Sequence, residues 1–202
     1  NDSFSPNLQE KKTKFKLNPR INENPYLDNQ LKQLEMQFLA TKKRLENKFG
    51  AKKFIVYFQS FTNTYAPFPT LKALYEKALS FDNVIGLSIG TRTDCVTDEI
   101  LDYLVDLSKT KEIWVEYGIQ SFYDETLVRV NRGDSVSNMK HWIKRTKEKG
   151  LNVCGHLIYG LPGENQEMML ETFKQTIELN VDSIKFHPLY VVKNTLLTNE
   201  FK

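Results

Sequence analysis

A chain of 202 residues, 40% of them hydrophobic, is long enough for one domain with a sizeable core. Its net charge of +3 is too small to indicate nucleic-acid binding by itself, and no uninterrupted apolar stretch approaches the roughly eighteen residues of a membrane helix. Its only two cysteines, Cys95 and Cys154, are too far apart in sequence for a disulfide framework or a compact metal motif. We therefore expect a protein of the reducing cytoplasm with no membrane segment.

Residues 1–26 are polar, punctuated by prolines and without helical or strand periodicity, so we expect an extended arm. The basic run EKKTKFKLNPR at 10–20 is typical of a solvated arm, and an RNA contact is the alternative. The chain opens on Asn rather than Met, and we expect it to be a fragment.

Residues 27–202 alternate helix-like and strand-like segments and form the expected core. Apolar residues from Leu27 to Phe49 recur at helical spacings, and Gly50 stands where a C-cap belongs. Strands are predicted to start near residues 54, 84, 113, 152 and 183, with further helices over 71–81, 98–109, 138–150 and 167–180. This alternation predicts an α/β fold with a parallel sheet, and leaves open a doubly wound sheet and a partial or full (β/α) barrel.

Polar residues stand near the carboxyl ends of these strands, where both architectures bind ligands. Strand alternation places Glu116 and Gln120 on the inner face of the sheet, with His156 beside them on the next strand. Lys185 and His187 occupy the fifth strand. Buried polar groups are costly unless they bind something, so these residues predict either a ligand site or a self-satisfied polar network.

GIQSFYDETLVRVNRG (118–133) and HLIYGLPGE (156–164) closely resemble stretches of radical S-adenosylmethionine enzymes, and within that superfamily they are similar to segments of oxygen-independent coproporphyrinogen dehydrogenase. The closer match is the YhcC-type subfamily, distantly related to the catalytic subunit of Elongator. Its fingerprints are YFQSFTNTYAP (57–67), IGTRTDC (89–95), WVEYGIQS (114–121), NRG (131–133), HLIYGLPGE and IKFHPLYVVKNT (184–195).

The resemblance implies a partial (β/α)6 TIM-like barrel, of which the five strands here are the second to the sixth. It also implies reductive cleavage of S-adenosylmethionine by a [4Fe-4S] cluster, giving a 5′-deoxyadenosyl radical that abstracts hydrogen from an unknown substrate. The implied partners are an electron donor such as flavodoxin or ferredoxin and, through the likeness to Elongator, a tRNA. The CxxxCxxC-like loop that holds the cluster is absent, so we expect no metal ligand in this chain, cluster cysteines upstream of Asn1, and an inactive fragment.

The resemblance also implies roles for single residues in binding S-adenosylmethionine. Gln120 would bind its ribose or methionyl group, Arg132 its carboxylate and His156 its ribose. Glu116 would bind the amino group or pair with Lys185. Main-chain groups that would meet the adenine edge belong to Ile158, Tyr159 and Gly160.

Further polar residues are expected to face the substrate. Those that would line the cavity or contact substrate are Gln59, Thr62, Asn63, Arg92, Lys185 and His187. Two other functions are compatible with the same residues. One is a non-catalytic barrel that binds S-adenosylmethionine or a nucleotide without a cluster. The other is an unrelated (β/α) enzyme that uses Glu116, His156 and Lys185 for acid–base chemistry.

Overall fold

The computed structural model describes residues 24, 26–192, 195 and 197–198. The expected N-terminal arm therefore lies almost entirely outside the described residues, as does its basic run at 10–20.

The described chain alternates helices and strands as the sequence predicts. The helices are α1 (Leu27–Phe49), α2 (Phe68–Leu79), α3 (Asp98–Ser108), α4 (Asp124–Arg129), α5 (Val136–Glu148), α6 (Gln166–Glu178) and a short 3-10 turn, η2 (Thr93–Cys95). The strands are β1 (Phe54–Phe58), β2 (Val84–Thr91), β3 (Glu112–Gln120), β4 (Asn152–Tyr159) and β5 (Ser183–Pro188). Gly50 ends α1 in the left-handed conformation, as expected for a C-cap.

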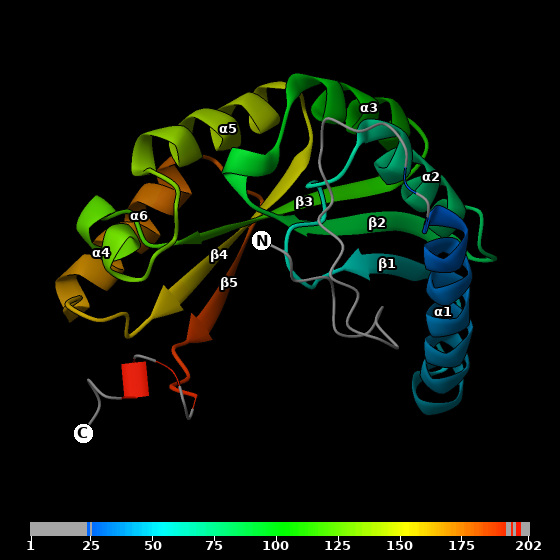
Figure 1. Cartoon of the computed structure of the whole chain (residues 1–202), viewed down its shortest axis with the longest axis horizontal. Coiled ribbons are helices and arrows are strands. Elements are labelled where there is room, and N and C mark those ends of the chain that lie inside the picture. The colour runs from blue at the N-terminus through cyan, green and yellow to red at the C-terminus, as the bar shows by residue number, and fades with distance from the viewer. Residues whose placement is uncertain (1–23, 25, 193–194, 196, 199–202) are drawn as a thin grey trace.

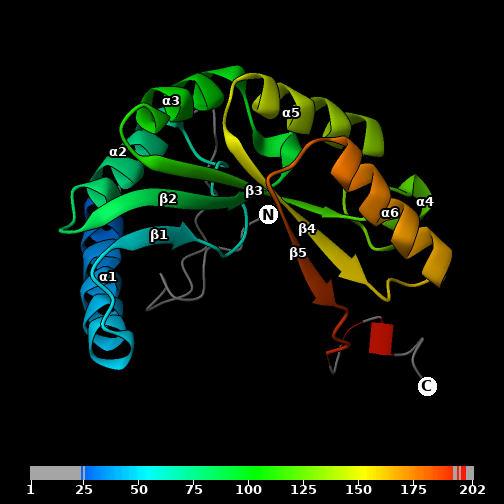
Figure 2. The ribbon, with the colours of Figure 1, turned by 180° about the vertical axis from the view of Figure 1, so that it is seen from behind.

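All five strands form one parallel sheet in the order β1-β2-β3-β4-β5. In a doubly wound sheet the strand order reverses at a switch point, whereas here each strand pairs with the one before it. The sheet curls, and α2, α3, α5 and α6 form an arc around its outside (Figures 1 and 2). The partial barrel is confirmed and the doubly wound alternative is excluded.

The hydrophobic core lies between this arc of helices and the outer face of the sheet. Its fully buried strand residues alternate along β3, where Val115, Tyr117 and Ile119 face the helices. The residues between them face the hollow inner side, as the alternation predicts for Glu116. The outer face thus supplies the stability, and the inner face is left for polar chemistry.

Two local features were not predicted from the sequence. Helix α4 is only six residues long, too short for its apolar residues to show a helical period. At the end of β3 the pairing with β4 shifts between Gly118 and Gln120, and Gln120 has a φ of 68°. The simple alternation along β3 therefore stops before Gln120. In the part of the chain that the structure describes, no helix combines the length and apolarity needed to cross a membrane.

Candidate functional site

The Glu116 carboxylate is the centre of a polar network on the inner face of the sheet. It is 6% exposed and accepts hydrogen bonds from residues of four strands. The Tyr57 hydroxyl donates to Oε2 over 2.7 Å, Ser88 Oγ donates to Oε1, and Lys185 Nζ lies 2.8 Å and 2.6 Å from the two oxygens. His156 Nε2 lies 2.6 Å from Oε2. A carboxylate has about four acceptor positions, so this one is fully used.

Two histidines carry the network from this buried carboxylate toward solvent. His156 Nδ1 lies 3.1 Å from Nε2 of the exposed His187, and the two rings stack with centroids 5.1 Å apart. Since His187 and Lys185 are two residues apart on β5, both face the inner side of the sheet. The sequence-based expectation that Glu116, His156, Lys185 and His187 lie together is confirmed. Gln120, which was expected on the same face, lies past the irregularity in the register of β3 with β4.

The charges in this network reinforce one another. Burial would raise the pKa of Glu116, but its four hydrogen-bond donors hold that pKa well below its usual range. Burial would likewise lower the pKa of His156, but contact with the Cys154 thiol and with Glu116 outweighs burial and raises the pKa to about 9. Burial and the neighbouring charges of His156 and Lys185 lower the pKa of His187. At neutral pH an imidazolium therefore bridges a carboxylate and a neutral imidazole.

A second group of predicted residues gathers where β3 ends. The Arg132 side chain is almost fully buried, and its Nη2 donates to the Gly118 carbonyl over 2.6 Å. Among the described residues its Nε–H has no hydrogen-bond partner. Gln120, two residues beyond Gly118, is held in the left-handed region that non-glycine residues rarely occupy. A buried, partly unpaired guanidinium thus lies beside a strained strand end.

The main-chain groups expected to meet adenine are at the end of β4, and some already have partners. The Tyr159 carbonyl accepts a hydrogen bond from Leu189 N–H over 2.8 Å, and Gly160 N–H donates to Met169 Sδ. Ile158 pairs in register with His187 of β5. Gly160 has a φ of 88°, as the tight Gly-Leu-Pro-Gly turn requires.

The residues expected to line the cavity after β1 and β2 divide into two kinds. Asn63 donates through Nδ2 to the carbonyls of Phe58 and Gly90, which fastens the loop after β1 to the end of β2. The Arg92 guanidinium makes a bidentate ion pair with Asp94 and donates a hydrogen bond to the main-chain carbonyl of Gly133, the residue after Arg132. These two side chains bind the protein itself. Thr62 is half-buried and Gln59 is exposed, which leaves both able to contact a ligand.

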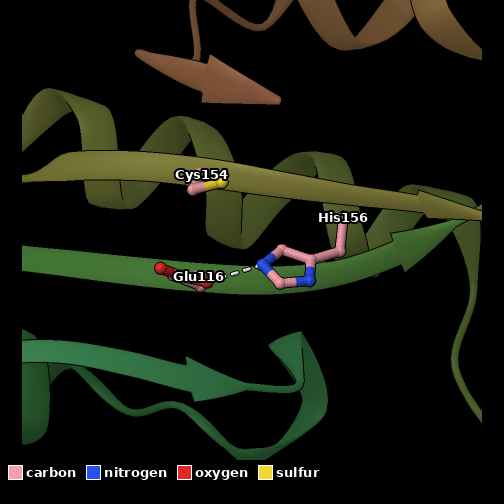
Figure 3. Close-up of side chains that lie close together, drawn as sticks. All are labelled: Glu116, Cys154 and His156. Carbon is pink, nitrogen blue, oxygen red and sulfur yellow. Dashed lines mark hydrogen bonds and ion pairs between the residues drawn. The ribbon is translucent and has the colours of Figure 1, made fainter. Parts of the chain in front are cut away.

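Three members of the network were missed by the sequence analysis: Tyr57, Ser88 and Cys154. Cys154 is buried directly opposite Glu116 in the pairing of β3 with β4. Its sulfur, a Glu116 oxygen and a His156 nitrogen all lie within 4.8 Å of one another (Figure 3). The available signal was the two-residue spacing of Cys154 and His156, which puts both on one face of a strand.

Comparison of the sequence with known proteins finds several relatives. Protein YhcC of Escherichia coli K12 is 40% identical over 165 residues, which are 81% of this chain and 53% of YhcC. A tRNA uridine(34) acetyltransferase of Methanocaldococcus infernus is 32% identical over 121 residues, 58% of this chain and 22% of that protein. The chain thus spans about half the length of YhcC.

Two solved structures share the fold. The Elp3 protein of Methanocaldococcus infernus, with an N-terminal deletion, superposes with a TM-score of 0.67 at 24% identity and covers 83% of this chain and 44% of its own. Coproporphyrinogen III oxidase (HemN) of Escherichia coli, described as a radical SAM enzyme, superposes with a TM-score of 0.61 at 18% identity. The match covers 85% of this chain and 41% of that protein. The likeness to the YhcC-type subfamily, and the distant ones to Elongator and to the coproporphyrinogen enzyme, are confirmed.

The match to a whole family rests on most of the described chain. A profile of the radical SAM superfamily matches residues 29–176, from the first turn of α1 to the last turn of α6. This range includes the first four strands and the loop that carries Arg132. The curled parallel sheet, the polar inner face and this match lead to one conclusion: the chain belongs to the radical SAM superfamily.

Proposed function

We propose that this chain binds S-adenosylmethionine at the carboxyl ends of its strands, as the barrel core of a radical SAM enzyme whose substrate is unknown. The Arg132 side chain carries this proposal. It is almost fully buried, yet one of its N–H groups has no partner among the described residues. Buried donors are nearly always paired, so this one fits a ligand that brings its own acceptor.

The chemistry of guanidinium favours a carboxylate as that acceptor. Its planar fork binds a carboxylate through two parallel N–H···O bonds, and the charge that burial makes costly is then neutralised. Burial and the nearby Arg92 guanidinium lower the pKa of Arg132, which means that its charged form is disfavoured and that a bound anion would stabilise it. S-adenosylmethionine carries a carboxylate on its methionyl part.

Gln120 supports the same place for the cofactor. A non-glycine residue with a φ of 68° costs about 1–2 kcal/mol and persists where the surrounding structure imposes it, often at ligand sites. Its amide both donates and accepts hydrogen bonds, which suits the ribose hydroxyls or the methionyl group. Both Gln120 and Arg132 lie beside Gly118, at the end of β3.

The iron–sulfur cluster does not fit the residues of this chain. A [4Fe-4S] cluster that keeps one iron open needs three thiolates, and the sequence has only two cysteines, Cys95 and Cys154. In radical SAM enzymes the cluster and S-adenosylmethionine together supply a radical that abstracts hydrogen. The share of this chemistry proposed for the chain is to bind and orient the cofactor and to face the substrate.

The substrate side of the proposal rests on the inner face of β4 and β5. Lys185 and His187 are both partly or fully exposed there, on the far side of the Glu116 carboxylate from β1 and β2. An ammonium and an imidazole suit a substrate with anionic or ionisable groups. A tRNA would meet this description, and the similarity to a tRNA uridine(34) acetyltransferase supports it as the nucleic acid to try first.

The test measures binding of S-adenosylmethionine by isothermal titration calorimetry, together with its decarboxylated form. If Arg132 binds the carboxylate, Arg132→Gln should weaken binding of S-adenosylmethionine by about 10- to 150-fold, the equivalent of one charge-assisted hydrogen-bonded pair. The unaltered chain should discriminate against the decarboxylated form by a similar factor, and the Arg132→Gln chain should not. Arg145→Gln, which removes an exposed ion pair between α5 and Asp98 of α3, is the matched control.

Comparing S-adenosylmethionine with its decarboxylated form distinguishes a direct contact of Arg132 with the carboxylate from a purely structural role of Arg132. A purely structural Arg132 would weaken both forms equally. Equal affinities of the unaltered chain for the two forms would therefore overturn the carboxylate assignment. Failure of the folded chain to bind S-adenosylmethionine at all would overturn the proposed function.

A further inference from the structure

The inner face of the sheet brings together three side chains of the kind that hold transition metals. Glu116 lies opposite Cys154 in the register of β3 and β4, and His156 follows two residues later on the same face. Each offers one ligand atom, and the three atoms lie within 4.8 Å of one another (Figure 3). Glu116 is 6% exposed and Cys154 1% exposed, so this is a buried cluster rather than a loose surface grouping.

The donor set is selective for one class of metal. A thiolate sulfur and an imidazole nitrogen suit Zn²⁺ and Co²⁺, whereas Ca²⁺ and Mg²⁺ prefer oxygen ligands throughout. One sulfur, one nitrogen and one oxygen from the protein occupy three positions of a tetrahedron. The fourth position is then open to water or to a substrate atom, as in catalytic zinc sites.

The neighbours of the three side chains also match such a site. His156 presents Nε2 to Glu116, and its other nitrogen, Nδ1, lies 3.1 Å from His187 Nε2. Metal-bound histidines almost always use their second nitrogen in a hydrogen bond of this kind. Ser88 and Tyr57 donate to the Glu116 carboxylate and fix its orientation.

The Lys185 ammonium is the main competitor for this site. It lies within 2.8 Å of both Glu116 oxygens, the region that a cation bound to Glu116 would occupy. The Lys185 side chain is, however, 41% exposed on the end-strand β5, so it can withdraw into solvent without moving the backbone. The ammonium and a divalent ion are thus alternative occupants of one anionic position.

We propose that Glu116, Cys154 and His156 bind one divalent transition-metal ion of the Zn²⁺ type, which displaces the Lys185 ammonium. The thiol and the imidazole give up their protons as the ion binds. The ligands of this site are residues other than Arg132 and Gln120, on which the proposed function rests, and its test does not involve S-adenosylmethionine.

The test uses Co²⁺ as an optical probe on the chain freed of metals by a chelator. One equivalent of Co²⁺ should produce a thiolate-to-cobalt charge-transfer band in the near ultraviolet, and Zn²⁺ should abolish it by competition. Cys154→Ser should abolish the band, while Cys95→Ser, which alters the only other cysteine, should keep it. Glu116→Gln should weaken Co²⁺ binding by at least about tenfold.

Lys185→Met gives a result that a generic metal-binding surface would not. Because the competing ammonium is gone, this variant should bind Co²⁺ more tightly than the unaltered chain. Circular dichroism confirms that each variant is folded. The inference is overturned if no charge-transfer band appears, if the band survives in Cys154→Ser, or if Lys185→Met binds Co²⁺ less tightly.

Discussion

Replacing the Glu116 carboxylate with an amide is the sharpest test of what holds the inner face together. In Glu116→Gln the side chain keeps its shape but loses its charge, and its NH2 group then points at donors that need an acceptor. Hydrogen bonds to a charged group contribute about 1.5–3 kcal/mol each. Ser88 and His156 are largely buried, so their hydrogen bonds to Glu116 contribute in this range. The Lys185 side chain is 41% exposed, so its ion pair with Glu116 contributes about 1 kcal/mol or less to stability.

The expected loss of stability is therefore about 2–4 kcal/mol, since the amide oxygen still accepts one or two of the original bonds. With a urea slope of about 2 kcal/mol/M, the unfolding midpoint should fall by about 1–2 M. Glu112→Gln is the matched control, because Glu112 is exposed on the same strand and should change stability by less than about 0.5 kcal/mol. A similarly small change for Glu116→Gln would refute the view that this carboxylate organises the network.

Three further predictions concern single residues. The free energy of unfolding should fall by about 1–3 kcal/mol as pH rises from 6.5 to about 9, because His156 keeps its proton to about pH 9 in the folded chain but releases it near pH 6.5 in the unfolded chain. In urea unfolding, His156→Gln should remove this dependence of stability on pH. Gly86→Ala should cost about 2 kcal/mol or more, because its Cβ would lie 2.0 Å from the Glu112 carbonyl oxygen; an unchanged melting temperature would contradict this. Gln120→Gly should raise stability by about 1 kcal/mol, by relieving its positive φ, yet weaken binding of S-adenosylmethionine; if both quantities stay unchanged, Gln120 is neither strained nor a ligand contact.

The regular part of the fold was predictable because its signal is periodic. The predicted strand starts fall within one residue of the observed ones, and helices α3, α5 and α6 begin within two residues of their predicted ranges. Core residues such as Tyr117 and Ile119 were assigned to the helix side by alternation alone. Helix α4 has no such signal, since six residues make fewer than two turns.

The site was predictable only where strand alternation reached it. Glu116, His156 and Lys185 were expected to meet, and they do. The sequence distance of Cys154 from Cys95 indicates no shared site, whereas its two-residue spacing from His156 places both side chains on one face of β4. Asn63 was expected to face a ligand, but its amide binds main-chain carbonyls, and contacts of a side chain with distant backbone leave no periodic trace in the sequence.

The strand order has a consequence for how the sheet assembles. Successive strands begin 28 to 40 residues apart, and each pairs with its immediate predecessor, so every pairing closes a loop of similar length. Since the entropy of loop closure varies only with the logarithm of loop length, no single pairing is much slower to form than the rest. The sheet can therefore grow one strand and helix at a time from whichever pair forms first. Its backbone pairing links only neighbouring strands, in the manner of a repeat protein, and the Glu116 side chain is what joins β1 and β5 directly to the central strand β3.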